Sequence, residues 1–446
     1  MLLIGNGTVL TMGQEPQVIA DGAVLVEGEK ILQVGKTEKL RLSNPTAHYI
    51  NARGKLIMPG LVNAHTHLYR AFAKGMGPVG EAPRDLPQIL KRIWWKLDKE
   101  LTVEDIYYSA MVELIECIKD GVTTVIDHHS SPSKVRGSMA ALSGAVGDMG
   151  VKACLCCEVS DRDGATTTLE GILENAGILL SCQDSSNSFL RGLFGLHASF
   201  TLSDETLRNC STVAAKFDAG FHVHAAEGMV DQEHSLAVCG SRVLERLNLF
   251  GILGPKTIAA HCVHVDSREM DLLRQSGTWV VHTPQSSMAH AVGAAPAVEM
   301  LAKGVAVALG TDGFTCDMFE SAKAANLLHK HACNNPSGGE VEVQQMLYVN
   351  NPRLAAGMFG GVWGVLGPGA WADIIVVDYL PSIPIDDSNW PRHLLYGVSG
   401  RAVETTVING QVRMLERRLT EVDENAVYTA ARECAAGLWR RLNHKG

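Results

Sequence analysis

The sequence lacks any apolar run close to the roughly 20 residues that a membrane-spanning helix needs. Its first residues also lack the basic segment and the long apolar segment of a signal peptide, so we expect none. Positive charge is scarce as well, because 39 lysines and arginines stand against 48 aspartates and glutamates, a formal net charge of −9. This balance argues against a nucleic acid or an anionic membrane as a partner. We therefore expect a cytoplasmic protein that binds a small molecule.

The chain also gives no sign of a disulfide framework. Its eleven cysteines are an odd number in 446 residues without a secretion signal, which favours reduced thiols. Cys154, Cys156 and Cys157 are close enough in sequence for a thiolate metal site. The segment 152–159, however, has the pattern of a buried strand, in which cysteine behaves as a small apolar residue. We interpret the three thiols as core residues.

The middle of the chain alternates apolar runs with amphipathic stretches. Stretches such as 102–119 and 241–250 have helical periodicity and separate consecutive apolar runs. Eight strands separated by helix-bearing connections are typical of a (β/α)8 barrel, so the predicted fold class is α/β with a TIM-like barrel. The eight runs are Leu56–Val62, Val122–Asp127, Lys152–Val159, Gly192–Leu196, Gly220–Val223, Thr257–Ala260, Thr278–Val281 and Val305–Leu309.

Both ends of the chain have a different texture, with short extended segments between turn residues. Near the C-terminus, Asn409-Gly410 separates two strand-like segments and predicts a hairpin with a type I′ turn. A helix is expected from about residue 422 to 442. These features predict a small β-sandwich built from both termini. The predicted domains are residues 1–57 and 364–446 for the β-sandwich, the latter with the terminal helix, and 58–363 for the barrel.

The sharpest chemical signal lies in the segment 59–67, which contains His65 and His67. Residues two apart in a strand point to the same face, so both imidazoles would project into the mouth of the barrel. Imidazole pairs held in this way suit a divalent metal such as zinc. Alone, a His-Thr-His triplet is a weak signal.

The signal is strengthened because histidines and acids recur at the ends of later strands. The active site of a barrel lies at this face, so these side chains would converge there. His222 and His224 lean the same way, but only one of them needs to reach a metal, and His264 is better interpreted as a loop residue. The recurring side chains are His222, His224, Glu227, His261, His264, His282 and Asp312.

With these residues in place, the chain resembles the amidohydrolase superfamily, in its cytosine deaminase and chlorohydrolase-like branch, and is similar to the aminohydrolases called SsnA. The resemblance runs nearly from end to end. Besides the His65 and His67 segment, the matching segments are 93–98, 126–132, 195–201, 259–264 and 310–313.

The resemblance implies a role for individual residues. His65, His67, His224 and Asp312 match metal ligands, and Glu227 matches the catalytic glutamate that follows the fifth-strand ligand. His261 matches a histidine that contacts the hydrolytic water, and His197 one that contacts the substrate. Asp312 would also accept a proton from the water, so the implied catalytic residues are Glu227, His261 and Asp312.

Two departures from the family pattern concern the metal and the seventh strand. Members with two metals carry a bridging lysine or acid at the end of the fourth strand, and the segment 156–161 compared with it has no lysine. We therefore expect one divalent ion, zinc or alternatively iron or manganese, with Glu158 as the residue that could support a second. In the seventh-strand motif, His282-Thr283-Pro284 has a hydroxyl where the family has an amide.

The resulting hypothesis is an aminohydrolase that releases ammonia from a small nitrogen-rich heterocycle, purine-like or pyrimidine-like, by attack of metal-activated hydroxide. Ring opening of a cyclic amide or imidazolone, or dehalogenation of a triazine, stays open as an alternative. A barrel that only binds a ligand is the alternative of another class. We expect a homo-oligomer. Candidate substrate contacts, besides His197, are Trp94, Trp95, Arg70 and Gln285, with Tyr69 near the mouth.

Overall fold

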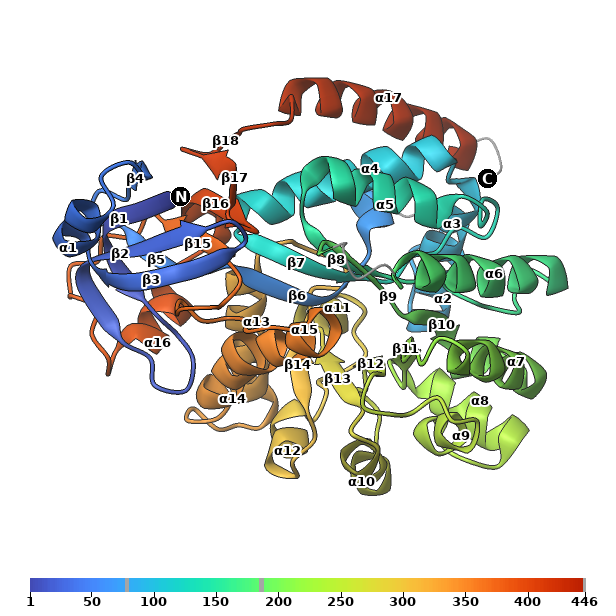
Figure 1. Cartoon of the computed structure of the whole chain (residues 1–446). Coiled ribbons are helices and arrows are strands. Elements are labelled where there is room, and N and C mark those ends of the chain that lie inside the picture. Colours follow the sequence, from blue (N-terminus) through green and yellow to red (C-terminus); the bar gives the residue numbers. More distant parts are fainter. Residues whose placement is uncertain (77–79, 184–187, 444–446) are drawn as a thin grey trace.

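The computed structural model describes residues 1–76, 80–183 and 188–443. Figure 1 shows a barrel surrounded by helices, with a β-sheet domain at one side that contains strands from both ends of the chain. The C-terminal helix α17 (Glu424–Asn443) lies over α4 (Val103–Lys119), and it matches the helix predicted for 422–442 within two residues. Within the described ranges, no helix combines the length and the hydrophobicity required to cross a membrane.

Eight parallel barrel strands follow one another in chain order among the described residues, which confirms the predicted TIM-like barrel. The fourth is interrupted at Leu193 and therefore carries two labels. The strands are β6 (Leu61–Thr66), β7 (Val122–Asp127), β8 (Lys152–Leu155), β9 (Leu190–Gly192) with β10 (Phe194–Ala198), β11 (Phe221–Ala225), β12 (Ile258–His261), β13 (Trp279–His282) and β14 (Val307–Leu309).

The nine labelled segments form a group of four, β6 to β9, and a group of five, β10 to β14, which meet at two seams. At one seam, Val159 forms a parallel bridge with Leu196. At the other seam, the backbone N–H groups of Thr311 and Asp312 both donate to the carbonyl oxygen of His65 at 3.0 Å. The second seam places Asp312, which follows the last strand, beside His65 on the first.

The segment predicted as one strand, Leu56–Val62, is divided at Gly60. Residues Leu56–Pro59 form β5 of the β-sheet domain, and the barrel begins with β6 at Leu61. A Cβ atom at Gly60 would lie 2.3 Å from Cγ2 of Thr123, so the bend requires a residue without a side chain. Periodicity does not reveal this packing constraint. The domain boundaries at 57/58 and 363/364 stay a prediction.

The β-sheet domain is a continuous sheet of nine strands within the described residues, with an N-terminal and a C-terminal part joined by pairing of β5 with β15. The predicted hairpin is present, because Asn409 and Gly410 have φ values of 50° and 72°, as a type I′ turn requires. The strands are β1 (Leu2–Leu10), β2 (Val18–Glu27), β3 (Lys30–Lys36), β4 (His48–Asn51), β5, β15 (Ile374–Val377), β16 (Val403–Ile408), β17 (Gln411–Leu415) and β18 (Arg418–Leu419).

Alternation along the barrel strands gives two apolar layers. In β7, Val125 packs outward against the helices, whereas Ile126 packs inside the barrel together with Cys154 and Cys156. Burial raises the pKa of both thiols, which supports their interpretation as core residues. All eleven cysteines lie in the described residues and carry free thiols.

The connections between the strands carry helices that cover the barrel. A short 3₁₀ helix and a helix with a π-helical stretch follow β6 and lie near the mouth. The helices are η1 (Leu68–Ala73), α2 (Leu86–Ile89), η2 (Leu90–Trp94), α3 (Trp95–Glu100), α5 (Ser138–Met149), α6 (Ala165–Ser181), η3 (Ser199–Thr201), α7 (Asp204–Ala215), α8 (Met229–Cys239), α9 (Val243–Leu249), α10 (Ser267–Ser276), α11 (Pro284–Ala289), α12 (Ala297–Ala302), α13 (Met318–Ala332), α14 (Glu340–Gln344), η4 (Gln345–Asn350) and α15 (Asn351–Phe359). Outside the barrel, α1 (Thr37–Ser43) belongs to the β-sheet domain, and α16 (Trp390–Arg392), η5 (His393–Gly397) and η6 (Gly400–Ala402) lie between β15 and β16.

Candidate metal centre and substrate cavity

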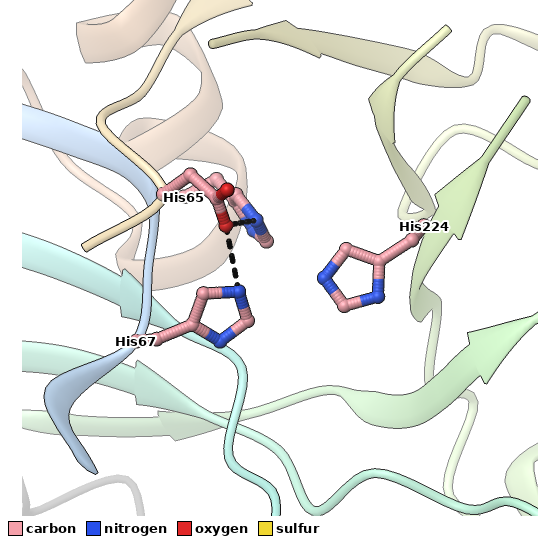
Figure 2. Close-up of side chains that lie close together, drawn as sticks. His65, His67 and His224 are labelled. Carbon is pink, nitrogen blue, oxygen red and sulfur yellow. Dashed lines mark hydrogen bonds and ion pairs between the residues drawn. The ribbon is translucent and has the colours of Figure 1, made fainter. Parts of the chain in front are cut away.

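Four side chains meet at the C-terminal ends of the barrel strands. His65 belongs to the end of β6, His67 follows it, His224 belongs to β11, and Asp312 follows β14. One potential ligand atom from each lies within 4.8 Å of the others, and all four residues are buried. Figure 2 shows the imidazoles of His65, His67 and His224 gathered around the same space.

Hydrogen bonds to the second nitrogen of each ring leave Nε2 facing this space. His67 Nδ1 donates to the carbonyl oxygen of His128 at 2.5 Å, and His224 Nδ1 donates to that of His197 at 2.9 Å. His65 Nδ1 lies 2.8 Å from Nε2 of His222, so His222 orients His65 rather than entering the cluster. Such contacts fix the tautomer and the orientation of a metal-binding imidazole.

The protonation states are those that a cation requires. Burial lowers the pKa of His65 to about 4 and holds the pKa values of His67 and His224 well below the ordinary value, so all three rings are neutral at pH 7. Burial alone would raise the pKa of the Asp312 carboxyl, but Arg70, His65 and His67 outweigh it and hold that pKa well below its ordinary range. Three neutral imidazoles and one carboxylate form the donor set of a catalytic zinc site.

The surroundings of one buried atom, His67 Nε2, also indicate a metal site. In the described part of the chain, His67 Nε2 has no hydrogen-bond partner, although Asp312 Oδ1 lies 2.8 Å away. A buried polar atom without a partner is costly, and a divalent ion between the two atoms would satisfy both. The four residues therefore fit a zinc ion.

The backbone near the cluster is strained. Ala226, His261 and Asp312 have φ values of 49°, 71° and 55°, in the left-handed region that residues with a side chain rarely adopt. Asp312 is held there by Arg70, whose Nη1 donates to the Asp312 carbonyl oxygen at 3.0 Å. Strain of this kind concentrates at functional sites.

Glu227 lies beside the cluster with its two oxygens in different surroundings. Oε1 accepts a hydrogen bond from His290 Nδ1 at 2.9 Å, and Oε2 lies 3.8 Å from His261 Nε2. Burial would raise the pKa of Glu227, but His261 and His290 outweigh it, so the pKa lies below its ordinary value. Thr283, the hydroxyl that replaces an amide of the family pattern, lies 2.8 Å from His261 Nδ1 and orients that ring.

A cavity with about 580 Å³ of empty space opens onto these residues. It is lined by His224, Glu227, His261 and Asp312, and also by most of the predicted substrate contacts. Those contacts are Tyr69, Arg70, Trp94, Trp95 and His197.

Gln285 does not line the cavity. It is the second residue of α11, and its Oε1 is buried without a hydrogen-bond partner among the described residues. The next residue, Ser286, instead reaches Asp312, since adjacent residues of a helix point in directions about 100° apart. His282 also points elsewhere and packs against His329, with 4.9 Å between ring centroids.

His290 and Asp98 line the cavity, although neither received a role from the sequence. His290 caps the C-terminus of α11 and therefore does not belong to the pattern of strand ends. Asp98 belongs to a segment that carries the family resemblance, but its spacing from other residues in the sequence indicated no chemical role. It lies 3.2 Å from Arg162, and burial raises its pKa to about 7.

Glu158 occupies a different position from the one assumed. It follows the third barrel strand, β8, whereas the fourth ends at Ala198, and neither end carries a lysine. Glu158 pairs with Arg162 at 2.7 Å, and it forms a second possible ligand group with His128 and His224. That group shares His224, whose Nδ1 is already bonded to a carbonyl, so its one free nitrogen serves a single ion. The geometry supports one metal.

Comparison with known proteins places the chain among hydrolases of this architecture. Residues 56–413 match the model of the amidohydrolase family. The chain is 32% identical over 451 residues to a 5'-deoxyadenosine deaminase of Methanosarcina mazei, covering 99% of each chain. It is 31% identical over 449 residues to a 5-methylthioadenosine/S-adenosylhomocysteine deaminase of Pelotomaculum thermopropionicum, again covering 99% of each chain.

A solved structure agrees with the fold. An adenosine deaminase from Xanthomonas campestris, with bound zinc, superposes with a TM-score of 0.86 at 22% identity and covers 98% of both chains. The match of the family model over most of the chain, together with relatives that align from end to end, shows that this protein belongs to the amidohydrolase family.

Proposed function

We propose that this protein is a zinc-dependent aminohydrolase that releases ammonia from a purine-like base or nucleoside. The observation that carries the proposal is the placement of Glu227 and His261 in the same cavity as His224 and Asp312, two of the four potential ligands. The deaminase names of the relatives support the reaction, and their adenine nucleosides support the substrate class. A barrel that only binds its ligand would have no need for buried acid–base groups beside the ion.

His65, His67, His224 and Asp312 would hold the ion, which lowers the pKa of a bound water toward about 7. Asp312 can accept a proton from that water. Glu227 exchanges a proton with a ring nitrogen of the substrate, which makes the adjacent carbon more electrophilic. His261, oriented by Thr283, stabilises the charge that develops at the reacting carbon.

The walls of the cavity suit a flat heterocycle. Trp94 and Trp95 both line the cavity, and Arg70 stacks on Trp94 at 4.2 Å from the guanidinium carbon to the ring centroid. His197 lies near Trp95, with 6.1 Å between ring centroids, and its ring nitrogen Nδ1 is 2.7 Å from Thr201 Oγ1. A bound ring would contact Trp95 and His197 and present its amino group to the ion.

The test is a measurement of ammonia release. Protein loaded with zinc, iron or manganese is incubated with 5'-deoxyadenosine, 5-methylthioadenosine, guanine, cytosine and an aminotriazine. We expect ammonia from an aminopurine or its nucleoside, and none from protein stripped with a chelator. Ring opening without ammonia, or chloride release from a chlorotriazine, would favour the alternative hydrolytic reactions. Absence of turnover on every compound with each metal would contradict the proposal.

The proposal also covers the oligomeric state, the location and the partners of the protein. We propose that the protein is a homo-oligomer of the cytoplasm, and that neither a nucleic acid nor a membrane is its partner. The net charge of −9 supports the absence of a nucleic-acid or membrane partner. Light scattering coupled to size-exclusion chromatography tests the first part, and a monomer at micromolar concentration would contradict it.

A further inference from the structure

Glu227 is held by a chain of two side chains that its family role does not explain. Trp94 Nε1 donates to His290 Nε2 at 3.4 Å, and His290 Nδ1 donates to Glu227 Oε1 at 2.9 Å. All three residues line the cavity, and the side chain of His290 is 6% exposed. The indole N–H can only donate, so it favours the neutral tautomer of His290 that carries its proton on Nδ1.

These contacts place the two carboxylate oxygens of Glu227 in different surroundings. Oε1 is occupied by His290, whereas Oε2 lies 3.8 Å from Nε2 of His261, whose ring stacks on that of the potential ligand His224. A carboxylate that exchanges a proton with bound substrate needs one oxygen aimed at that proton. His290 fixes the rotation of the Glu227 carboxylate that achieves this.

We propose that His290 is a positioning residue for the reaction, which holds Glu227 as an ionised carboxylate with Oε2 free to take up and deliver a proton. This inference rests on the proposed function. In the resting enzyme His290 Nδ1–H donates to Oε1. During the reaction, Oε2 takes a proton from the attacking water and passes it to the ring nitrogen of the substrate, while the second proton of the water leaves with the ammonia, so Glu227 ends ionised as it began and His290 keeps its own proton.

The charges around the pair agree with this assignment. Glu227 is faced by His261 at the end of β12, by His290 after α11 and by Asp312 after β14. His290 is faced in addition by Arg70 of η1. The two histidines lower the pKa of Glu227 against the effect of burial, while Asp312 acts in the opposite direction. Removal of His290 therefore raises that pKa.

Two substitutions separate positioning from simple packing. His290→Leu removes the donor, whereas His290→Asn retains an N–H group near the place of Nδ1. In zinc-loaded protein, we expect His290→Leu to lower kcat about 10- to 100-fold with KM changed less than about threefold, and to move the acid limb of the kcat/KM profile up by about one pH unit. His290→Asn should restore most of kcat and the original acid limb.

Two controls complete the activity test. His331→Asn, an exposed change on α13, should leave the kinetics unchanged. In a Glu227→Gln background, His290→Leu should cost less than about twofold, because it acts through Glu227. A His290→Leu enzyme with the wild-type kcat and pH profile would overturn the proposal, as would a His290→Asn enzyme as impaired as His290→Leu.

A second readout does not depend on turnover and so distinguishes failure of this inference from failure of the proposed function. The unfolding equilibrium of the zinc-loaded protein is measured for wild type, His290→Leu, Glu227→Gln and the double variant. A direct hydrogen bond to a charged group predicts that the effects on the equilibrium constant are non-additive by about tenfold or more. Additive effects would show that the pair does not interact in solution, whatever the substrate.

Discussion

Ser286 Oγ lies 2.5 Å from Asp312 Oδ2, and this hydrogen bond links α11, after the seventh barrel strand, to the carboxylate that follows the eighth. The other oxygen, Oδ1, lies 2.8 Å from His67 Nε2 and 3.3 Å from His65 Nε2. Because Ser286 occupies Oδ2, the orientation of the carboxylate is fixed, and Oδ1 is the oxygen that faces the two imidazoles. Ser286 therefore controls the geometry of the candidate metal centre without belonging to it.

Ser286→Ala should weaken zinc binding about 10-fold, because loss of a hydrogen bond to a metal ligand commonly costs 10- to 100-fold in affinity. Competition with a chromogenic chelator measures the zinc dissociation constant. Ser287→Ala is the matched control, since that hydroxyl donates to the carbonyl oxygen of Thr283 and does not reach Asp312. Equal zinc affinities of wild type and Ser286→Ala would contradict the prediction.

His224→Ala should remove the bound metal. The substitution deletes one of three imidazoles and leaves the carbonyl oxygen of His197 without its donor. Plasma mass spectrometry of protein purified with added zinc should then give well under one equivalent. His264→Ala, a change of a half-buried loop residue, serves as the control and should keep the wild-type content. Full zinc content in the His224 variant would refute its assignment as a ligand.

Glu227→Gln should keep the metal and lose turnover. The amide preserves the size of the side chain but cannot exchange a proton, and general acid–base catalysis is typically worth about 10²–10⁴-fold. Metal analysis and ammonia release on the same sample provide the two measurements. Turnover within about threefold of wild type would remove Glu227 from the mechanism.

Much of this site was predictable because it follows from strand geometry. His65 and His67 share a face by the two-residue period of a strand, and parallel barrel strands bring His224 and Asp312 to the same end. The role of His290 could not be predicted from a periodic sequence pattern, because this residue caps a helix and reaches Glu227 only through the tertiary fold.

Other differences have equally specific causes. The division of the first strand at Gly60 depends on contact with Thr123, which belongs to a neighbouring strand. Ser286 and Gln285 are adjacent polar residues, so the sequence could not show which of them contacts the site. Their different directions on α11 bring only Ser286 to Asp312. Sequence patterns thus identified which elements supply the site, whereas packing decided which neighbouring side chain contacts it.

Asp127→Asn should stabilise the metal-free protein at alkaline pH. Burial raises the pKa of Asp127 to about 7, whereas in the unfolded chain it is about 3.9. Below about pH 3.9 the carboxyl is neutral in both states. Between about pH 3.9 and 7 only the unfolded chain releases the proton, so stability is lost across this window, and above pH 7 the folded state holds an unfavourable buried charge. Asparagine carries no charge and can still accept from the backbone N–H of Leu68.

The free energy of unfolding should therefore differ by about 3–4 kcal/mol in favour of Asp127→Asn at pH 8, and the difference should shrink as the pH falls toward 4. Urea denaturation of both proteins across this range measures it. Asp271→Asn, an exposed change on α10, should show no such trend. A difference that grew on acidification would have the wrong sign for a raised pKa.

Lys152→Met should destabilise the contact between the barrel and the β-sheet domain. Lys152 of β8 is fully buried and pairs at 2.5 Å with Asp373, which precedes β15, while Trp363 and Trp371 flank its ammonium group. Loss of one partner from a buried pair leaves an uncompensated charge and costs about 3–5 kcal/mol, so Lys152→Met should lower the free energy of unfolding by that amount.

The double variant Lys152→Met/Asp373→Asn should recover much of the loss, because it removes the uncompensated charge of Asp373 as well. Lys256→Met is the matched control, since it breaks an exposed pair with Asp218 and should cost less than about 1 kcal/mol. Urea denaturation at pH 7 distinguishes these outcomes, and a Lys152 variant as stable as the Lys256 control would mean that the ion pair contributes nothing to the junction.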